Sequence, residues 1–137
     1  MRRVRWSFRL SGDRGSSPVE LAILAPAVLL ALFASIQVAA VFMARSVALS
    51  AAQEASTAER SFGAPAGAGE DRGRTFLARA GDWLDAGQVD VDRNGEQVTT
   101  TVTGQAISLI PGFTFTVSQT ARGEVERFTT DDGEATP

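Results

Sequence analysis

The clearest pattern along the chain is a long, uninterrupted apolar run. No residue from Leu21 to Ala44 is charged, and only Ser35 and Gln37 within this run are clearly polar. As an α-helix rising about 1.5 Å per residue, the run measures about 36 Å, which exceeds the roughly 30 Å hydrocarbon core of a bilayer. The pattern predicts a membrane-spanning helix.

Signals at both ends extend this helix beyond the apolar run. Ser17 suits an N-cap, and Pro18 suits the first helical turn, where its missing N–H is not needed. Pro26 lies inside the run and is expected to bend the helix. After the run the helical period continues, with apolar residues three or four positions apart: Val47, Ala51, Ala55, Ala58 and Phe62. We predict one helix over residues 17–62, capped by Gly63.

A glycine- and alanine-rich stretch, residues 63–70, is predicted to be a flexible linker. A second, shorter helix is expected after it, closed by Gly87. The apolar residues assigned to one face of this helix are Phe76, Leu77, Ala80, Trp83 and Leu84. Trp83 is accordingly expected in the core.

From Gln88 the period of the apolar positions changes to two, which is typical of β-strands. Val89 and Val91 alternate with acids, and Asn94-Gly95 predicts a tight hairpin turn. The second strand is predicted from the alternation of Val98, Thr100 and Val102 with polar residues. A third strand is predicted after the turn Pro111-Gly112, with one face formed by Phe113, Phe115, Val117 and Ala121.

Three strands with one apolar face need a cover, because so small a sheet is unstable alone in water. The alanine-rich face of the long helix is the expected cover, since small side chains let a sheet approach closely. The predicted fold class is α+β, a long N-terminal transmembrane helix continuing into an amphipathic helix packed on a small antiparallel β-meander. The apolar stretch 107–113 is expected to pack beneath the helix; the alternatives are an interaction edge or a membrane-skimming loop.

Charge is distributed unevenly along the chain. Residues 1–15 carry five arginines and one acid, whereas residues 16–137 carry eight arginines and fifteen acids. A basic flank favours the cytoplasmic side of a membrane, so the acidic C-terminal part is expected outside. We predict a basic leader (1–15), the long helix (16–62), the linker (63–70), an extracytoplasmic α+β domain (71–128) and a disordered acidic tail (129–137).

Several kinds of chemistry are disfavoured by composition. Cysteine and histidine are both absent, which removes disulfides, thiol catalysis, the usual general base and the commonest metal ligand. An acidic domain with few aromatic residues repels phosphates, so no nucleic-acid partner is expected. We therefore expect no enzyme activity, no catalytic residue, no cofactor and no metal; the acids Asp90, Asp92 and Glu96 lack the spacing of a calcium loop.

The junction between the basic stretch and the apolar run contains a more specific pattern. Gly15 and Ser16 are followed by Glu20, the fifth residue after the glycine, and Pro26 comes six places after the glutamate. This segment resembles the TadE-like family of pilus-assembly proteins. The later stretch 50–60, rich in alanine and ending in an arginine, is similar to the corresponding part of that family. The close resemblance covers residues 14–62.

The resemblance implies a pilin-like fold and a structural role. It implies a pseudopilin-like or minor pilus-assembly component of a bacterial tight-adherence-type pilus or secretion system, single-pass in the cell membrane with its N-terminus cytoplasmic. Gly15 and Ser16 would form the processing site of a prepilin-type peptidase, and Glu20 and Pro26 would serve assembly. In the family such a glutamate pairs with the N-terminal amine of a neighbouring subunit. The implied partners are the lipid bilayer, that peptidase, other pilin-like subunits and pilus-assembly membrane proteins.

Two alternatives remain open on the residues alone. The first is a secreted β-rich protein with a cleaved export signal, for which Val38-Ala39-Ala40 and Ser46-Val47-Ala48 offer small-residue sites. The second is a plain bitopic membrane protein in which Glu20 is only a helix-start acid facing the macrodipole. An apolar run far longer than the roughly 7–15 residues of a signal core argues against the first.

Overall fold

The computed structural model describes residues 18–127, and these form two helices and one three-stranded sheet. The elements are, in order, α1 (Pro18–Arg60), α2 (Ala68–Ala80), β1 (Leu84–Asn94), β2 (Gln97–Ala106) and β3 (Phe115–Glu124). The α+β prediction is confirmed, including the long helix and the antiparallel sheet. The chain divides into two compact units between Ala34 and Ser35. We call residues 18–34 of α1 the apolar segment and residues 35–60 the covered segment.

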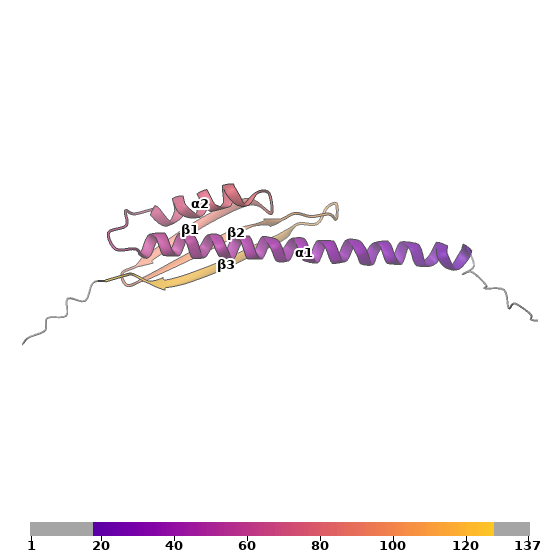
Figure 1. Ribbon diagram of the computed structural model, residues 1–137, viewed down its shortest axis with the longest axis horizontal. Helices are drawn as coiled ribbons and strands as arrows, with labels where there is room; N and C mark the ends of the chain where they lie inside the picture. The colour runs from indigo at the N-terminus through magenta and orange to yellow at the C-terminus, as the bar shows by residue number, and fades with distance from the viewer. Residues whose placement is uncertain (1–17, 128–137) are drawn as a thin grey trace, which may run out of the picture. The chain divides into compact units, whose positions relative to one another are not determined.

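The sheet is a simple meander of order β1-β2-β3, with both pairs antiparallel. Along β2, Val98, Thr100 and Val102 are fully buried, and the residues between them are only half-buried. This alternation is the one expected of a strand covered on one face only. Figure 1 shows the covered segment running along the sheet and α2 lying beside β1.

The core is built from small residues on α1 and branched residues on the sheet. Five alanines of the covered segment have no exposed surface: Ala44, Ala48, Ala51, Ala52 and Ala55. They pack in one cluster with Leu84, Val89, Val102, Ala106 and Val117 of the strands. Because alanine has no side chain beyond Cβ, the helix backbone can approach the sheet closely. The prediction that the alanine-rich face covers the sheet is confirmed.

The second helix differs from the predicted one at both ends. It begins at Ala68, within the stretch predicted to be linker, and it ends at Ala80. Gly81 follows with φ 78°, a conformation that interrupts the helix and favours glycine. The assignment of Gly87 as the helix end was wrong, since Gly87 lies in β1 at a register irregularity. A Cβ there would come within 2.9 Å of Leu77 Cδ1, so glycine allows the close approach of α2.

Two predicted core placements were also wrong. Trp83 lies in the turn between α2 and β1 and is 42% exposed, because Gly81 takes the chain out of the helical period that would have buried it. The stretch 107–113 is not packed under the helix, since Leu109 and Phe113 are 44% and 63% exposed. It forms the loop between β2 and β3, and Phe113 precedes β3 rather than belonging to it.

The first hairpin is close to the predicted one. Its two loop residues are Gly95 and Glu96, since Asn94 pairs with Gln97. Gly95 has φ 57°, and a glycine with positive φ at the first of two loop residues is typical of a type II′ turn. The predicted pair Asn94-Gly95 therefore identified the hairpin one position early. The long helix ends at Arg60, and Gly63, with φ 72°, lies in the turn after it.

Candidate functional site

Glu20 lies in the first turn of α1 and is exposed. A carboxylate at this position faces the positive end of the helix macrodipole, which stabilises it by about 0.3–1 kcal/mol. Within residues 18–127 it forms no ion pair. Among the described residues, the carboxylate therefore lies exposed in the first turn of the helix without a charged partner.

Pro26 lies inside α1, two turns after its start, and the helix continues through it. Because proline has no N–H, it cannot donate the helical hydrogen bond to the carbonyl oxygen of Ala22. Six helical positions separate Glu20 from Pro26, about 9 Å along the axis and about 120° apart around it. The glutamate and the proline therefore mark different faces of the same helix.

The apolar segment exposes every one of its side chains. Its large apolar residues are between 49% and 71% exposed: Val19, Leu21, Ile23, Leu24, Val28, Leu29, Leu30, Leu32 and Phe33. A continuous apolar surface of this kind marks a membrane or protein contact. α1 is also long and apolar enough to cross a bilayer, by length and composition. Glu20 and Pro26 both belong to this segment.

The other two predicted site residues, Gly15 and Ser16, lie outside the described residues. The structure therefore describes Glu20 and Pro26, which were predicted to serve assembly, and not the two residues predicted to form the processing site. It adds one residue that the sequence analysis noted only as a polar interruption of the apolar run. This residue is Gln37, in the covered segment.

Gln37 joins the β2–β3 loop to α1 through two hydrogen bonds. Its Nε2 donates a hydrogen bond to the carbonyl oxygen of Ile107 at 3.0 Å, and its Oε1 accepts one from the N–H of Leu109 at 2.8 Å. The side chain is only 4% exposed. A buried amide that satisfies one backbone acceptor and one donor fixes the position of a loop. The available signal was the presence of a glutamine inside an apolar helix, where an amide needs a partner.

A second buried polar residue joins α1 to α2. Glu59, 4% exposed, accepts a hydrogen bond from the N–H of Gly69 at 2.8 Å, and its Oε1 is 4.0 Å from Arg93 Nη1. A Cβ on Gly69 would lie 2.7 Å from the carbonyl oxygen of Ala55, so only glycine fits there. Arg72 adds a more exposed ion pair to Glu54 at 3.0 Å. These contacts hold α2 against the covered segment.

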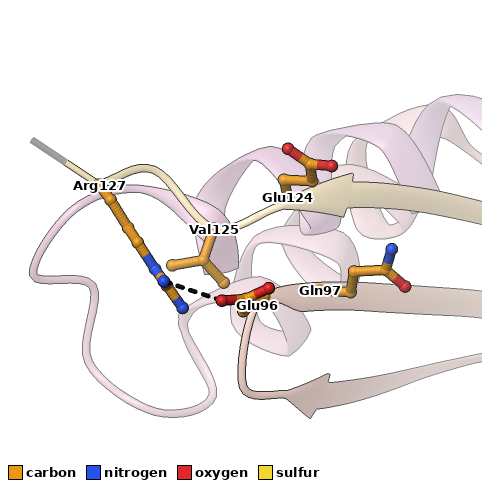
Figure 2. A pocket seen from close by; sticks show the side chains of 5 residues that line it. All are labelled: Glu96, Gln97, Glu124, Val125 and Arg127. Carbon is orange, nitrogen blue, oxygen red and sulfur yellow. Dashed lines mark ion pairs between the residues drawn. The ribbon is translucent and has the colours of Figure 1, made fainter. Parts of the chain in front are cut away.

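A polar pocket lies at the end of the sheet that carries the β1–β2 turn. Figure 2 shows its lining, Glu96, Gln97, Glu124, Val125 and Arg127, with the ion pair between Arg127 and Glu96 at 2.9 Å. Both charged partners are largely exposed, so the pair contributes little to stability. Among residues 18–127, no group of three or more acidic side chains is placed to hold a metal ion.

Comparison with known proteins finds one match. The family model described as TadE-like protein matches residues 15–57. The matched stretch contains Gly15, Ser16, Glu20 and Pro26, and it ends within the covered segment of α1. No curated protein and no solved structure matches the chain significantly. The predicted resemblance to the TadE-like family is thus confirmed as a match over residues 15–57.

Proposed function

We propose that this chain is a single-pass pilus-assembly component of the pseudopilin type, working in a tight-adherence-type pilus or secretion system. The apolar segment lies in the cell membrane, the basic N-terminal flank lies on the cytoplasmic side, and the sheet lies outside. The observation that carries the proposal is the change in the surface of α1 along its length. One helix presents Glu20 in its first turn, then an uncovered apolar segment, then an alanine face that forms the core of the sheet domain.

The burial of the covered segment argues against a cleaved export signal. Cleavage after Ala40 would remove Gln37 and so release the β2–β3 loop. Cleavage after Ala48 would also remove Ala44 and Ala48, which are fully buried in the core. The first cut would release the loop, and the second would also expose part of the buried face of the sheet to water. The sheet stays covered only while the helix remains attached. Such a helix is suited to be a permanent anchor.

The proposed role of the chain is structural rather than catalytic. Its contribution is a helix that packs beside other pilin-like helices, with Glu20 pairing with the N-terminal amine of a neighbour. An isolated carboxylate at the membrane edge is costly, and such a partner neutralises it. Removal of the leader by a prepilin-type peptidase between Gly15 and Ser16 would create this amine. Pro26 leaves the Ala22 carbonyl without its helical donor, which a neighbouring helix can supply.

The mature N-terminus tests the processing step. Mass spectrometry of the membrane fraction is expected to identify a chain that starts at Ser16. A start at Met1 in the membrane would contradict processing while retaining the anchor. A start near Val41 or Leu49 in the medium would instead establish the export-signal alternative and exclude the anchor.

Glu20→Ala tests the assembly role. We expect the variant to integrate into the membrane as the native chain does, because the substitution makes the helix more apolar. We expect it to be lost from the assembled pilus complex, measured by co-purification with the other pilus components. Glu124→Ala, at an exposed carboxylate of β3, is the matched control and should assemble normally. Equal assembly of both variants would reduce Glu20 to a helix-end charge.

A further inference from the structure

The β2–β3 loop, residues 107–113, exposes an unusual amount of apolar surface for a segment outside a helix or strand. Ile107, Leu109, Ile110 and Phe113 are 41%, 44%, 39% and 63% exposed. These large side chains do not belong to the core, which is formed elsewhere. An exposed apolar cluster of this kind indicates a contact that the isolated chain does not make.

Several backbone groups of the loop are hydrogen-bonded within the protein. Gln37 binds the Ile107 carbonyl and the Leu109 N–H. The Ser108 hydroxyl donates to the Ile110 carbonyl oxygen at 3.0 Å and accepts from the Ile110 N–H at 3.3 Å. The Phe113 N–H donates to the Ile110 carbonyl oxygen at 3.2 Å. Pro111 has no N–H to satisfy. Backbone groups that enter a lipid environment must be paired within the protein, and this loop meets much of that requirement.

The loop is attached to the apolar run of α1, not to its polar part. Gln37 lies within the uncharged run that continues to Ala44, and the first charge after it is Arg45. Eight helical positions separate Gln37 from Arg45, about 12 Å along the axis. Val38 and Phe42, which follow Gln37 in the same run, are 69% and 72% exposed. The loop therefore continues an apolar surface that α1 already presents.

Charged residues are also distributed unevenly along the sheet. No residue from Gln97 to Ala121 is charged, so the far ends of β2 and β3 and their loop are neutral. The opposite end carries Glu96, Glu124 and Arg127, the charged residues of the pocket in Figure 2. Figure 1 shows the β1–β2 turn and the β2–β3 loop at opposite ends of the sheet. Two exposed acids, Asp82 and Asp85, line a pocket together with Ile107, and they limit how deeply the loop can enter lipid.

We propose that loop 107–113 is a second membrane contact of the chain. It rests on the same bilayer that α1 enters, with Leu109, Ile110 and Phe113 in the interfacial layer and Asp85 and Arg45 at the level of the headgroups. The contact fixes the sheet domain against the membrane before assembly. The inference rests on the membrane anchor of the proposed function, and the lipid surface is chosen because the loop adjoins the anchor's own apolar run.

The test uses depth-dependent quenching in the full-length chain. Because the chain has no cysteine, single cysteines carrying an environment-sensitive fluorophore can be introduced at Phe113, at Phe33 of the apolar segment and at Glu96 in the β1–β2 turn. The chains are reconstituted in phosphatidylethanolamine–phosphatidylglycerol vesicles that contain brominated lipids. We expect quenching at 113, strongest with bromines near the headgroups. We expect quenching at 33 and none at 96.

The three positions separate the failure of the inference from that of the anchor. Quenching at 33 but not at 113 overturns the loop contact alone. Absence of quenching at both 33 and 113 overturns the anchor and the loop contact together. Protection of position 113 from aqueous iodide without quenching by brominated lipid would assign the loop to a protein neighbour, which also overturns the proposal.

A second variant excludes insertion driven by the label. Leu109→Asp places a carboxylate in the loop without touching the core, since Leu109 is exposed. With the label at position 113, we expect this substitution to lower the quenching to the level at position 96, while quenching at position 33 is unchanged. If quenching at 113 persists in the Leu109→Asp chain, the fluorophore itself partitions into the lipid. That result would overturn the proposal.

Discussion

The apolar segment of α1 exposes large branched side chains such as Ile23 and Leu30, at 71% and 70%, whereas the covered segment buries Ala48 and Ala51 completely. Both are parts of one helix, and neither contains a glycine. They differ in the size of the side chains that meet their surroundings. Small side chains occur where a folded sheet must approach, and large ones occur where no part of the described chain packs.

This contrast shows that helix period and side-chain size carry separate information. The period identifies a helix and its apolar face. Size indicates what that face meets, because a rigid sheet needs a close, complementary surface, whereas lipid chains adapt to bulky residues. Gln37, near the border between the two segments, adds a specific polar contact at which the loop is fixed. Variants that exchange the properties of the two segments test this interpretation.

The largest effect is expected for a charge in the apolar segment. Leu30→Arg replaces a residue that favours membrane insertion with one that opposes it. The free energy of insertion becomes less favourable by about 3–4 kcal/mol near the centre of a spanning helix. We expect the variant to lose stable membrane integration, measured by extraction with alkaline carbonate. Leu49→Arg is the matched control, because Leu49 is 38% exposed on the covered segment, beyond the uncharged run. Equal extraction of the two variants would contradict the assignment of the span.

A smaller effect is expected from enlarging the alanine face. Ala48→Leu adds three carbon atoms at a position with no exposed surface. Overpacking of this kind costs about 1–3 kcal/mol, and we expect the upper half of that range because the helix and the sheet are already in contact. The measurement is resistance of the sheet domain to proteolysis across a urea series. Ala39→Leu, the same change at an exposed position, should lie within about 0.5 kcal/mol of the native chain.

Much of the covered segment, and of the strand that packs on it, could be predicted from the sequence because the signals are local and repeated. Ala51 and Ala55 recur at helical spacing, and Val98 and Val102 alternate with polar residues, so each face was assigned from spacing alone. Glu20 and Pro26 were identified by their distance along the chain, which needs no knowledge of packing. The TadE-like family model matches residues 15–57, the stretch that contains both residues.

The predictions failed for two different reasons, a glycine that ends a helix and a contact between distant parts of the chain. Trp83 continues the helical spacing of Phe76 and Leu77, yet Gly81 ends the helix first, and periodicity cannot register such an interruption. Loop 107–113 was expected beneath the helix because its residues are apolar. Its backbone is instead held by Gln37 from seventy positions earlier, and its side chains are left exposed. A glutamine inside an apolar helix indicates that a partner is needed, but a contact so distant along the chain leaves no pattern that identifies the partner.

The smallest effect is expected at the contact near the border of the two segments. Gln37→Met preserves the length of the side chain and removes both hydrogen bonds to the loop. The Ile107 carbonyl and the Leu109 N–H then lose their partner, which costs about 1–2 kcal/mol if they stay buried and less if the loop opens to solvent. Hydrogen exchange of the Leu109 amide is therefore the sharper measurement, and we expect it to accelerate while exchange in β2 is little changed. Gln53→Met, at an exposed position of the same helix, should leave it unaltered. An unchanged Leu109 exchange rate in Gln37→Met would mean that the loop is held by its own turn, through Ser108 and Ile110, and that the covered segment acts on the sheet through its alanine face alone.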